Sequence, residues 1–580
     1  QVNAETAANA YFNPRHRIDM PFIDVDEINR HYDIGAACET NELRCMRLEL
    51  DKIDQAQTVQ QFSFVSASSH ARLLILEKDS EQYVDSGLLW LSTRSDDSTQ
   101  NVDVDLIRRS QNVESFASAN AYYRMIDPLD QATTLTDWLN HRGFVAGVES
   151  EPNFAHATYV NNYDLGFGRD MVMRKDDCGN VYSYVDNYPT LELALQHRNS
   201  FATVVMEYSS SNTALACNQQ DAKFVKFYAY VPSDFTGEMV RASSMNFDGR
   251  GEKYMPGVCT VCHGGTPYNT NNAMNPASVV EFVSTLADDA NIIAAVDALD
   301  SERVATMANL NATFMPFDLN AFLYAEEDDL NLTDPYLNSS LLTNIDTASY
   351  SKENQLGAFR QFNKNVLSTY LDARNNETET NNETEINNNE GDESSRWDAP
   401  INLINSWYNT SIDNLEQLDT IDTQNFHGDA VLPGWENQTA IYHDVFAKYC
   451  RACHIQTDQT RVNFATAEEF LGEIDIETGL PANFSKVVEQ VLSRGQMPAA
   501  RLTYDRFWAD FNGNTASAGE QLVDVLTQYD PDLAQTPLTS TVSIDAVIQD
   551  NNNKPSANLD GSANGTDQQI RILASGLIDT

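Results

Sequence analysis

The sequence predicts a multidomain α+β protein, with a β-rich N-terminal domain, two mainly α-helical domains and a short β tail at the C-terminus. The chain of 580 residues is longer than a single hydrophobic core usually is. Runs of β-forming residues dominate its first part, and helical periodicity replaces them from about residue 246. The expected boundaries are 1–245, 246–372, 373–395, 396–532 and 533–580.

Strands are expected in the first domain wherever short apolar or alternating runs lie between polar, turn-forming segments. A helix should interrupt these strands near Trp138, with Thr136 as its N-cap. The runs that indicate strands are Gln57–Ala67, Ala71–Glu77, Gly87–Ser92, Ala157–Asn161, Asn180–Asp186, Phe201–Tyr208 and Lys223–Val231.

The two helical domains are expected on either side of an acidic, asparagine-rich run. In the first, one helix should begin after Asn275-Pro276 and a longer one should cover about Ser351 to Asp372. Residues 375–395 have almost nothing apolar to bury and are expected to form a linker or a long surface loop. In the second, we expect a helix from Tyr442 to Tyr449 and another that Ser485 caps.

The C-terminal tail contains two alternating runs, Thr541–Ile548 and Gln569–Leu573, with a turn-rich segment between them. This pattern predicts a β-hairpin. A terminal hairpin exposes strand edges, so it should pair with a sheet of its own chain or of a neighbour.

The charge of the chain restricts its partners. It has 37 basic and 85 acidic residues, a net charge of −48, which repels nucleic acids and anionic membranes. The apolar runs are too short to span a bilayer, so no transmembrane segment is expected. The chain begins at Gln1 without a signal peptide, which we interpret as a mature exported protein.

Two copies of one cysteine motif carry the chemistry. Residues 259–263 and 450–454 both read C-x-x-C-H, the attachment pattern of c-type haem. Two thiols three positions apart lie on one side of a helical turn, where they can form thioethers with the two vinyl groups of a porphyrin, and the next histidine can ligate the iron. A zinc site or redox dithiols are the alternatives, and both leave the two histidines unexplained. The motifs predict two covalently bound haem c groups, held by Cys259, Cys262, His263, Cys450, Cys453 and His454.

The other four cysteines suit an oxidising compartment outside the cytoplasm, where haem c is attached and disulfides persist. Pairing between neighbours in the sequence is favoured, as Cys38–Cys45 and Cys178–Cys217, although four cysteines allow three connectivities. Buried free thiols are the alternative.

The far side of each iron decides the function, because a methionine there closes the site for electron transfer and an open position permits chemistry. For the second iron the candidate is Met497, which follows His454 by 43 residues and precedes a proline. For the first iron it is Met315, also followed by proline. That iron could instead be vacant or water-bound, and its other candidate ligands are Met171, His70, His141, His156 and His197.

These residues resemble bacterial dihaem c-type cytochromes. The motif at 450–454, followed by Met497-Pro498-Ala499 and Phe507-Trp508, is similar to a cytochrome c domain with histidine and methionine ligands. The run Asp164–Met171 resembles a segment of large exported bacterial cytochromes c, in which a histidine often follows the methionine that here precedes Val172. The resemblance implies that both helical domains are cytochrome c-like haem domains.

Three functions follow from this resemblance. The leading hypothesis is an electron carrier, not an enzyme, that passes electrons between a donor and an acceptor in the periplasm, at the cell surface or outside the cell. The second is a dihaem peroxidase or oxygenase in which the first haem is open. The third is a subunit of an extracellular cytochrome filament, which would make the protein a homo-oligomer.

Overall fold

The computed structural model describes residues 115–531 and, outside them, the backbone of short strands within 23–102 and 541–578. Within 115–531 the gaps are 234–235, 246, 248–252, 266–278, 287–290, 326–346, 382–395, 422–424, 456–465, 473, 476–478, 494–496, 499, 501–502, 504–506 and 508–516.

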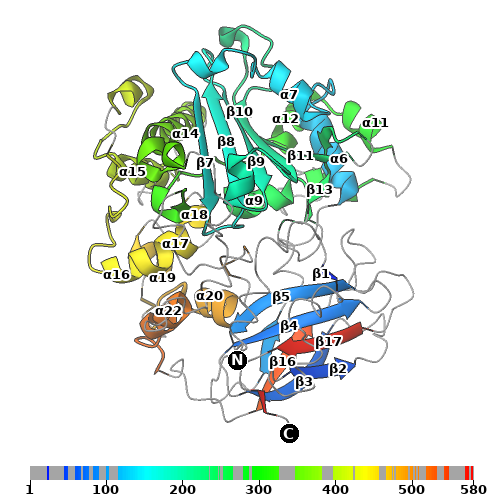
Figure 1. Cartoon of the computed structure of the whole chain (residues 1–580), viewed down its shortest axis with the longest axis vertical. Coiled ribbons are helices and arrows are strands. Elements are labelled where there is room, and N and C mark those ends of the chain that lie inside the picture. Colours follow the sequence, from blue (N-terminus) through cyan, green and yellow to red (C-terminus); the bar gives the residue numbers. More distant parts are fainter. Residues whose placement is uncertain are drawn as a thin grey trace.

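A seven-stranded antiparallel sheet forms the centre of the molecule, in the order β12-β11-β10-β9-β8-β7-β15 (Figure 1). The five long strands are consecutive in the sequence and each pairs with the next, for example Tyr159 with Arg169 and Met206 with Phe227. The strands are β7 (Ala155–Asn161), β8 (Gly168–Lys175), β9 (Val181–Tyr188), β10 (Ala202–Ser209), β11 (Phe224–Pro232), β12 (Met239–Arg241) and β15 (Phe322–Leu323).

The predicted fold class is wrong, because the sheet and the helices do not form successive domains. Strand β15 lies far beyond residue 245 yet pairs with β7, through Phe322 and Asn161. One continuous buried core includes side chains from Ala119 to Leu526. The physical reason is the length of the helices nearest the first motif: α9 (Gly257–His263), α10, α11 and α12 have 8 residues or fewer, and such short helices cannot enclose a core of their own.

The long helix α14 (Lys352–Asn381) packs on one side of the sheet, against β7 and β8. Its Phe359 ring lies 5.3 Å from that of Tyr159. Near its other end, Asp372 accepts hydrogen bonds from the hydroxyl of Tyr208 at 3.0 Å and from the Lys223 ammonium at 3.1 Å. Because α14 ends at Asn381, it includes the first part of the run 375–395 that was expected to be a loop. Residues 382–395 lie outside the described ones.

Helix α6 (Phe116–Ile126) lies near the opposite side of the sheet from α14, beside β11 (Figure 1). It begins with a capping box, in which the Ser115 side chain accepts from the Ser118 backbone and the Ser118 side chain from that of Ser115. The Tyr122 hydroxyl then accepts the Phe227 N–H at 3.0 Å, which satisfies a backbone donor of β11.

The remaining helices are short, and two of them correct the expected positions. Thr134, not Thr136, caps α7. Ser485 lies inside α20, whose N-cap is Asn483. The expected helix start at Asn275-Pro276 lies outside the described residues, and helix α10 is described from Val279. Their bounds are α7 (Leu135–His141), α8 (Leu191–Leu195), α10 (Val279–Ser284), α11 (Ile292–Asp297), α12 (Ser301–Ala308), α15 (Asp398–Trp407), α16 (Thr439–Ile441), α17 (Ala447–Tyr449), α19 (Ala467–Leu471), α20 (Phe484–Val487) and α22 (Ala518–Leu526).

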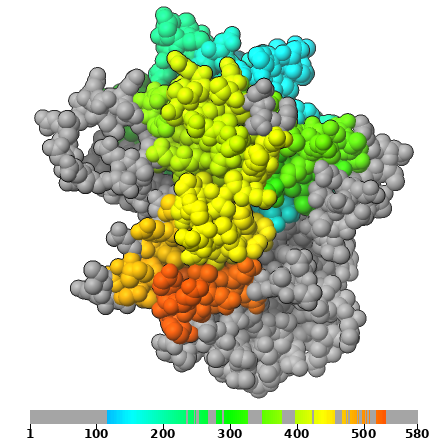
Figure 2. All heavy atoms as spheres, turned by 90° about the vertical axis from the view of Figure 1, so that its left-hand side faces the viewer, coloured from blue at the N-terminus to red at the C-terminus, as the bar shows by residue number. Residues whose placement is uncertain are grey.

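The later helices pack against the earlier part of the chain. In the space-filling view, residues 396–455 (yellow) lie directly against the green residues that include α14, and the orange residues up to 531 continue from them (Figure 2). Among the helices in the described ranges, none is both long and apolar enough to cross a bilayer.

The strands near the two chain ends pair with one another. Strand β16 (Thr541–Val547) lies between β3 (Val59–Ser66) and β6 (Thr99–Val102), and β17 (Gln568–Leu573) lies between β4 and β2. Because β16 and β17 belong to different sheets, the two runs do not form the expected hairpin. The other bounds are β1 (Ile23–Asp24), β2 (Cys45–Glu49), β4 (His70–Glu77), β5 (Gln82–Trp90) and β18 (Leu577–Ile578).

Candidate functional site

The first motif forms helix α9 (Gly257–His263). Immediately after it, Gly264 and Gly265 both adopt positive φ angles, which glycine tolerates. A Cβ atom at Gly265 would lie 2.2 Å from the Leu310 carbonyl oxygen, so only glycine fits at this position. This close approach brings the segment that contains Thr313 against the end of α9.

The imidazole of His263 is partly buried and its orientation is set by the backbone. Its Nδ1 donates to the carbonyl of Thr313 at 3.0 Å, and the Thr313 N–H donates back to the His263 carbonyl at 2.9 Å. The Phe227 ring lies 5.4 Å away. Burial lowers the pKa of His263 to about 4. The ring is therefore neutral at pH 7, and with the proton on Nδ1 its Nε2 lone pair can bind a metal.

The second motif follows a helix with a π-helical turn, η7 (Tyr442–Phe446), and forms α18 (Arg451–His454). The first variable residue of this motif, Arg451, is almost completely buried. Its guanidinium donates to the Tyr442 hydroxyl at 2.8 Å and forms an ion pair with Asp318. It also lies over the rings of Trp407 and Tyr442, at 5.5 Å and 5.4 Å. Since Asp318 comes from the predicted first helical domain, this ion pair joins the two motif regions.

The two motifs meet in space, although 188 positions separate Cys262 from Cys450. Helices α9 and α18 pack against each other at one end of the sheet (Figure 1). Interaction with the Cys453 thiol and burial together raise the pKa of Cys262. Burial raises the pKa of Cys259 to about 12 and that of Cys450 as well. The four motif cysteines are free thiols.

The loop between β7 and β8 lies beside both motifs. Its Tyr163 ring contacts that of Tyr449, directly before the second motif, at 5.4 Å. At the start of β8, Arg169 donates to Asp164 at 3.0 Å, and its charge lowers the pKa of the neighbouring His263. The Nε of Arg169 is buried and has no hydrogen-bond partner among the described residues. The resemblance in Asp164–Met171 was the signal that could have placed this loop at the site.

Both predicted methionine ligands are half-buried. The Met497 N–H donates to the Gln490 carbonyl at 3.2 Å, at the end of the π-helical turn η8 (Val488–Ser493). Met315 comes two residues after Thr313, which contacts the Nδ1 side of His263. A sixth ligand must approach an iron from the opposite side, beyond Nε2. Ligation by either methionine stays a prediction.

The alternative ligands for the first iron have other partners. Met171 is buried on β8 and accepts a hydrogen bond from the Tyr159 hydroxyl at 3.4 Å. His156 and His197 both contact the Asp170 carboxylate, at 2.6 Å and 3.2 Å.

The last two histidines are accounted for separately. His141 Nδ1 lies 2.8 Å from a carbonyl of its own helix, that of Asp137. His70 falls outside the residues whose side chains are described.

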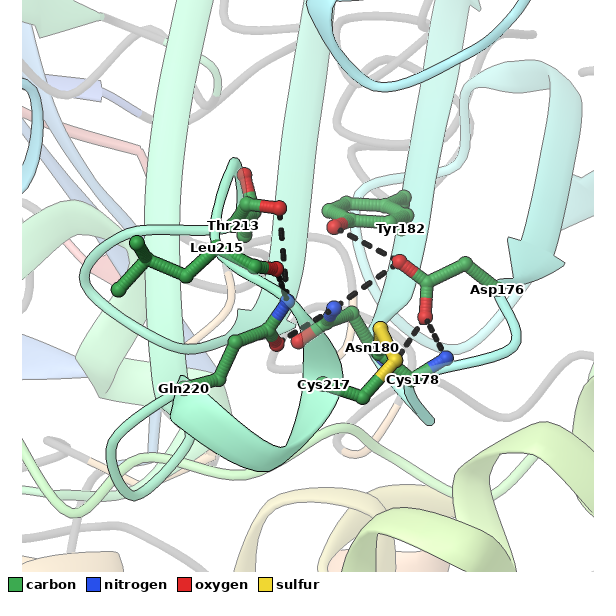
Figure 3. The surroundings of a disulfide bond; sticks show 8 residues. All are labelled: Asp176, Cys178, Asn180, Tyr182, Thr213, Leu215, Cys217 and Gln220. Carbon is green, nitrogen blue, oxygen red and sulfur yellow. Dashed lines mark hydrogen bonds between the residues drawn. A yellow bond between two sulfur atoms is a disulfide. The ribbon is translucent and has the colours of Figure 1, made fainter.

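The structure confirms one of the two expected disulfides. Cys178, in the turn between β8 and β9, is bonded to Cys217, which begins the short helix η2 (Cys217–Gln219), with Cα atoms 5.0 Å apart (Figure 3). The Asp176 carboxylate beside it accepts from the Cys178 N–H and the Asn180 side chain, both at 2.9 Å. Cys38 and the side chain of Cys45 lie outside the described residues.

No protein-family model, curated protein or solved structure matches this chain. Among the described residues, no group of three or more His, Cys, Asp or Glu side chains is arranged to hold a metal ion by itself. A c-type haem would need only one histidine from each motif as proximal ligand, because the porphyrin would supply four nitrogen ligands of its own.

Proposed function

We propose that this protein is an exported dihaem c-type cytochrome that transfers electrons between redox partners outside the cytoplasm. The observation that carries the proposal is the meeting of two C-x-x-C-H helices, α9 and α18, in one body. Cys259 and Cys262 would hold one haem and Cys450 and Cys453 the other, with His263 and His454 as proximal ligands. Each covalently bound haem would supply one-electron chemistry at its iron.

The surroundings of His263 suit a proximal ligand. The Thr313 carbonyl fixes the proton on Nδ1 and restrains rotation of the ring, so that Nε2 is directed away from the supporting segment. The Phe227 ring, 5.4 Å away, covers part of the imidazole.

The packing of the motif helices supports electron transfer within the chain. Because helices α9 and α18 pack against each other, the points at which the two haems would be attached are neighbours. The chain thus provides one route through two centres, and the proposed sixth ligands Met497 and Met315 would close both to exogenous ligands.

The proposed compartment has independent physical support. The Cys178–Cys217 disulfide is stable only where thiols are not kept reduced, as in the periplasm or outside the cell. The net charge of −48 favours a cationic face on the electron donor or acceptor, with encounter rates that fall as salt is added.

A catalytic first haem is the second candidate, and one contact favours it. Met315 follows by two residues Thr313, whose carbonyl contacts the Nδ1 side of His263. If Met315 were not a ligand, a haem held by His263 would have an open position for peroxide or oxygen, as in the dihaem peroxidases and oxygenases.

Spectroscopy of the full chain, produced together with haem-attachment machinery, tests both candidates. The carrier requires two haems that survive acid–acetone extraction and two low-spin signals in electron paramagnetic resonance. The double variants C259A/C262A and C450A/C453A should each lose one haem, whereas the control C178A/C217A should retain both. A stable high-spin signal that disappears only in C259A/C262A would favour the enzyme, and extraction of all colour would contradict both.

Ligand variants assign the sixth positions. Met497→Leu should convert the second haem to a high-spin form with a lower potential, and Met315→Leu should do the same for the first. The matched control is Met173→Leu, a buried methionine on β8. An unchanged spectrum in Met315→Leu would show that this residue is not a ligand.

A further inference from the structure

The guanidinium of Arg169, at the start of β8, contains a buried donor without an acceptor. Its Nη2 donates to the Asp164 carboxylate at 3.0 Å, and the two side chains are only 16 % and 17 % exposed. The same oxygen of Asp164 also accepts from the Asn161 side chain at 3.0 Å. The Nε of Arg169 is buried and finds no hydrogen-bond partner in the part of the chain that the structure describes. A buried donor on a charged group is costly to leave unpaired, so a missing acceptor is expected at this position.

Arg169 lies on the face of the sheet that also carries His263. It pairs with Asn187 on β9. Four positions earlier in β9, Ser183 lies in the row of paired residues that crosses β10 and ends at Phe227 on β11. Residues four positions apart in a strand point to the same face, so Arg169 and Phe227 share a face of the sheet. Because the Phe227 ring lies 5.4 Å from that of His263, the first motif ends on this face.

The loop that precedes Arg169 reaches the second motif as well. The Tyr163 ring lies 5.4 Å from that of Tyr449, the residue directly before this motif. The Thr503 hydroxyl donates to the Tyr163 carbonyl at 2.8 Å, which joins the loop to the segment that follows Met497. Figure 1 shows both motif helices at the end of the sheet where this loop connects β7 to β8. The buried donor is therefore close to the region in which the two haems would be attached.

We propose that Arg169 binds a propionate carboxylate of the haem that His263 holds. This inference rests on the proposed function, because the porphyrin supplies the acceptor. The propionates are the anionic groups at the edge of a haem, and guanidinium groups bind carboxylates through charge-assisted N–H donors. Asp164 takes one donor of Arg169 and leaves the buried Nε for the haem. In a chain with a net charge of −48 such a donor is scarce, and Arg451 of the second motif is already paired with Asp318.

The charge of Arg169 has a consequence for the iron. Burial and, to a smaller extent, this charge lower the pKa of His263, as a cation near the imidazole must. A positive charge near an iron centre also favours its reduced state, because reduction removes one positive charge. Arg169 should therefore raise the reduction potential of the first haem, and the carboxylate of Asp164 should lower it.

Redox titration and resonance Raman spectroscopy of the haem-loaded full chain test this assignment. Arg169→Gln should lower the potential of the first haem and shift the propionate bending mode, which responds to hydrogen bonds at the carboxylate. Arg169→Lys keeps the charge but not the planar fork, so it should restore most of the potential but not the mode. The control Arg174→Gln removes a guanidinium of the same strand that pairs with Glu151 at 2.9 Å, and it should change neither property. Near-ultraviolet circular dichroism confirms that each variant is folded.

Chains with one haem show which porphyrin is bound. Arg169→Gln should lower the potential in the background C450A/C453A, which retains the first haem, and should have no effect in C259A/C262A. A shift confined to C259A/C262A would overturn the assignment to the first haem.

Asp164→Asn separates binding of the haem from a purely structural ion pair. The proposal requires that this variant raise the potential, opposite to Arg169→Gln. If Arg169 only held the loop in place through Asp164, both variants would shift the potential in the same direction and leave the propionate mode unchanged. Two attached haems with an unchanged mode in Arg169→Gln would overturn this proposal alone, whereas a chain without covalent haem would overturn it together with the proposed function.

Discussion

The buried ion pair between Arg451 and Asp318 offers a sharp test of how the second motif is held. In Asp318→Asn the guanidinium of Arg451, whose side chain is 3 % exposed, loses the charge partner that it has among the described residues. Breaking a buried pair in this way costs about 3–5 kcal/mol. We expect the lower end, about 3 kcal/mol, because the Tyr442 hydroxyl and the Trp407 and Tyr442 rings still contact the guanidinium.

Equilibrium unfolding in urea, followed by near-ultraviolet circular dichroism, measures this loss. The matched control is Asp419→Asn, which breaks the ion pair of Lys364 with a carboxylate that is 94 % exposed and should change stability by less than about 1 kcal/mol. Replacing both Arg451 and Asp318 by apolar residues should recover most of the loss, because no uncompensated charge remains. Equal effects of the two single variants would refute the reasoning.

Three further predictions concern other parts of the molecule. Gly265→Ala should destabilise the protein by about 2 kcal/mol or more in urea unfolding, since its Cβ would collide with the Leu310 carbonyl at a positive φ; a smaller loss would contradict this. Burial lowers the pKa of Lys226 to about 8 from 10.5. The unfolded chain therefore binds more protons between these pH values, and stability should rise with pH across this window by about 3 kcal/mol more than in Lys226→Met, as urea titrations at each pH would show. The variant C178A/C217A should lose about 2–4 kcal/mol by the same measurement, and reductant should then have no further effect at this site.

The sequence identified features that depend on a few neighbouring residues. The C-x-x-C-H spacing is local, so both motifs and their helices could be found without a fold. Four of the long strands also follow from local composition, as does the pairing of Cys178 with Cys217, which are neighbours among the cysteines. Strand β8 was not predicted as a strand, because its charged residues between methionines do not alternate in polarity.

Long-range packing decided the rest. His263 meets a carbonyl 50 positions away, and Arg451 meets Asp318 across 133 positions. No local sequence pattern predicts such contacts, and the residues that flank Arg451 do not indicate that its charge is buried. By itself the sequence determined which chemical groups the chain can offer, two thiols and an imidazole in each of two motifs. Only the tertiary structure decided that these groups lie together against one sheet. The motif helices α9 and α18 are too short to enclose a core of their own, so they bury their apolar faces in a core shared with the sheet.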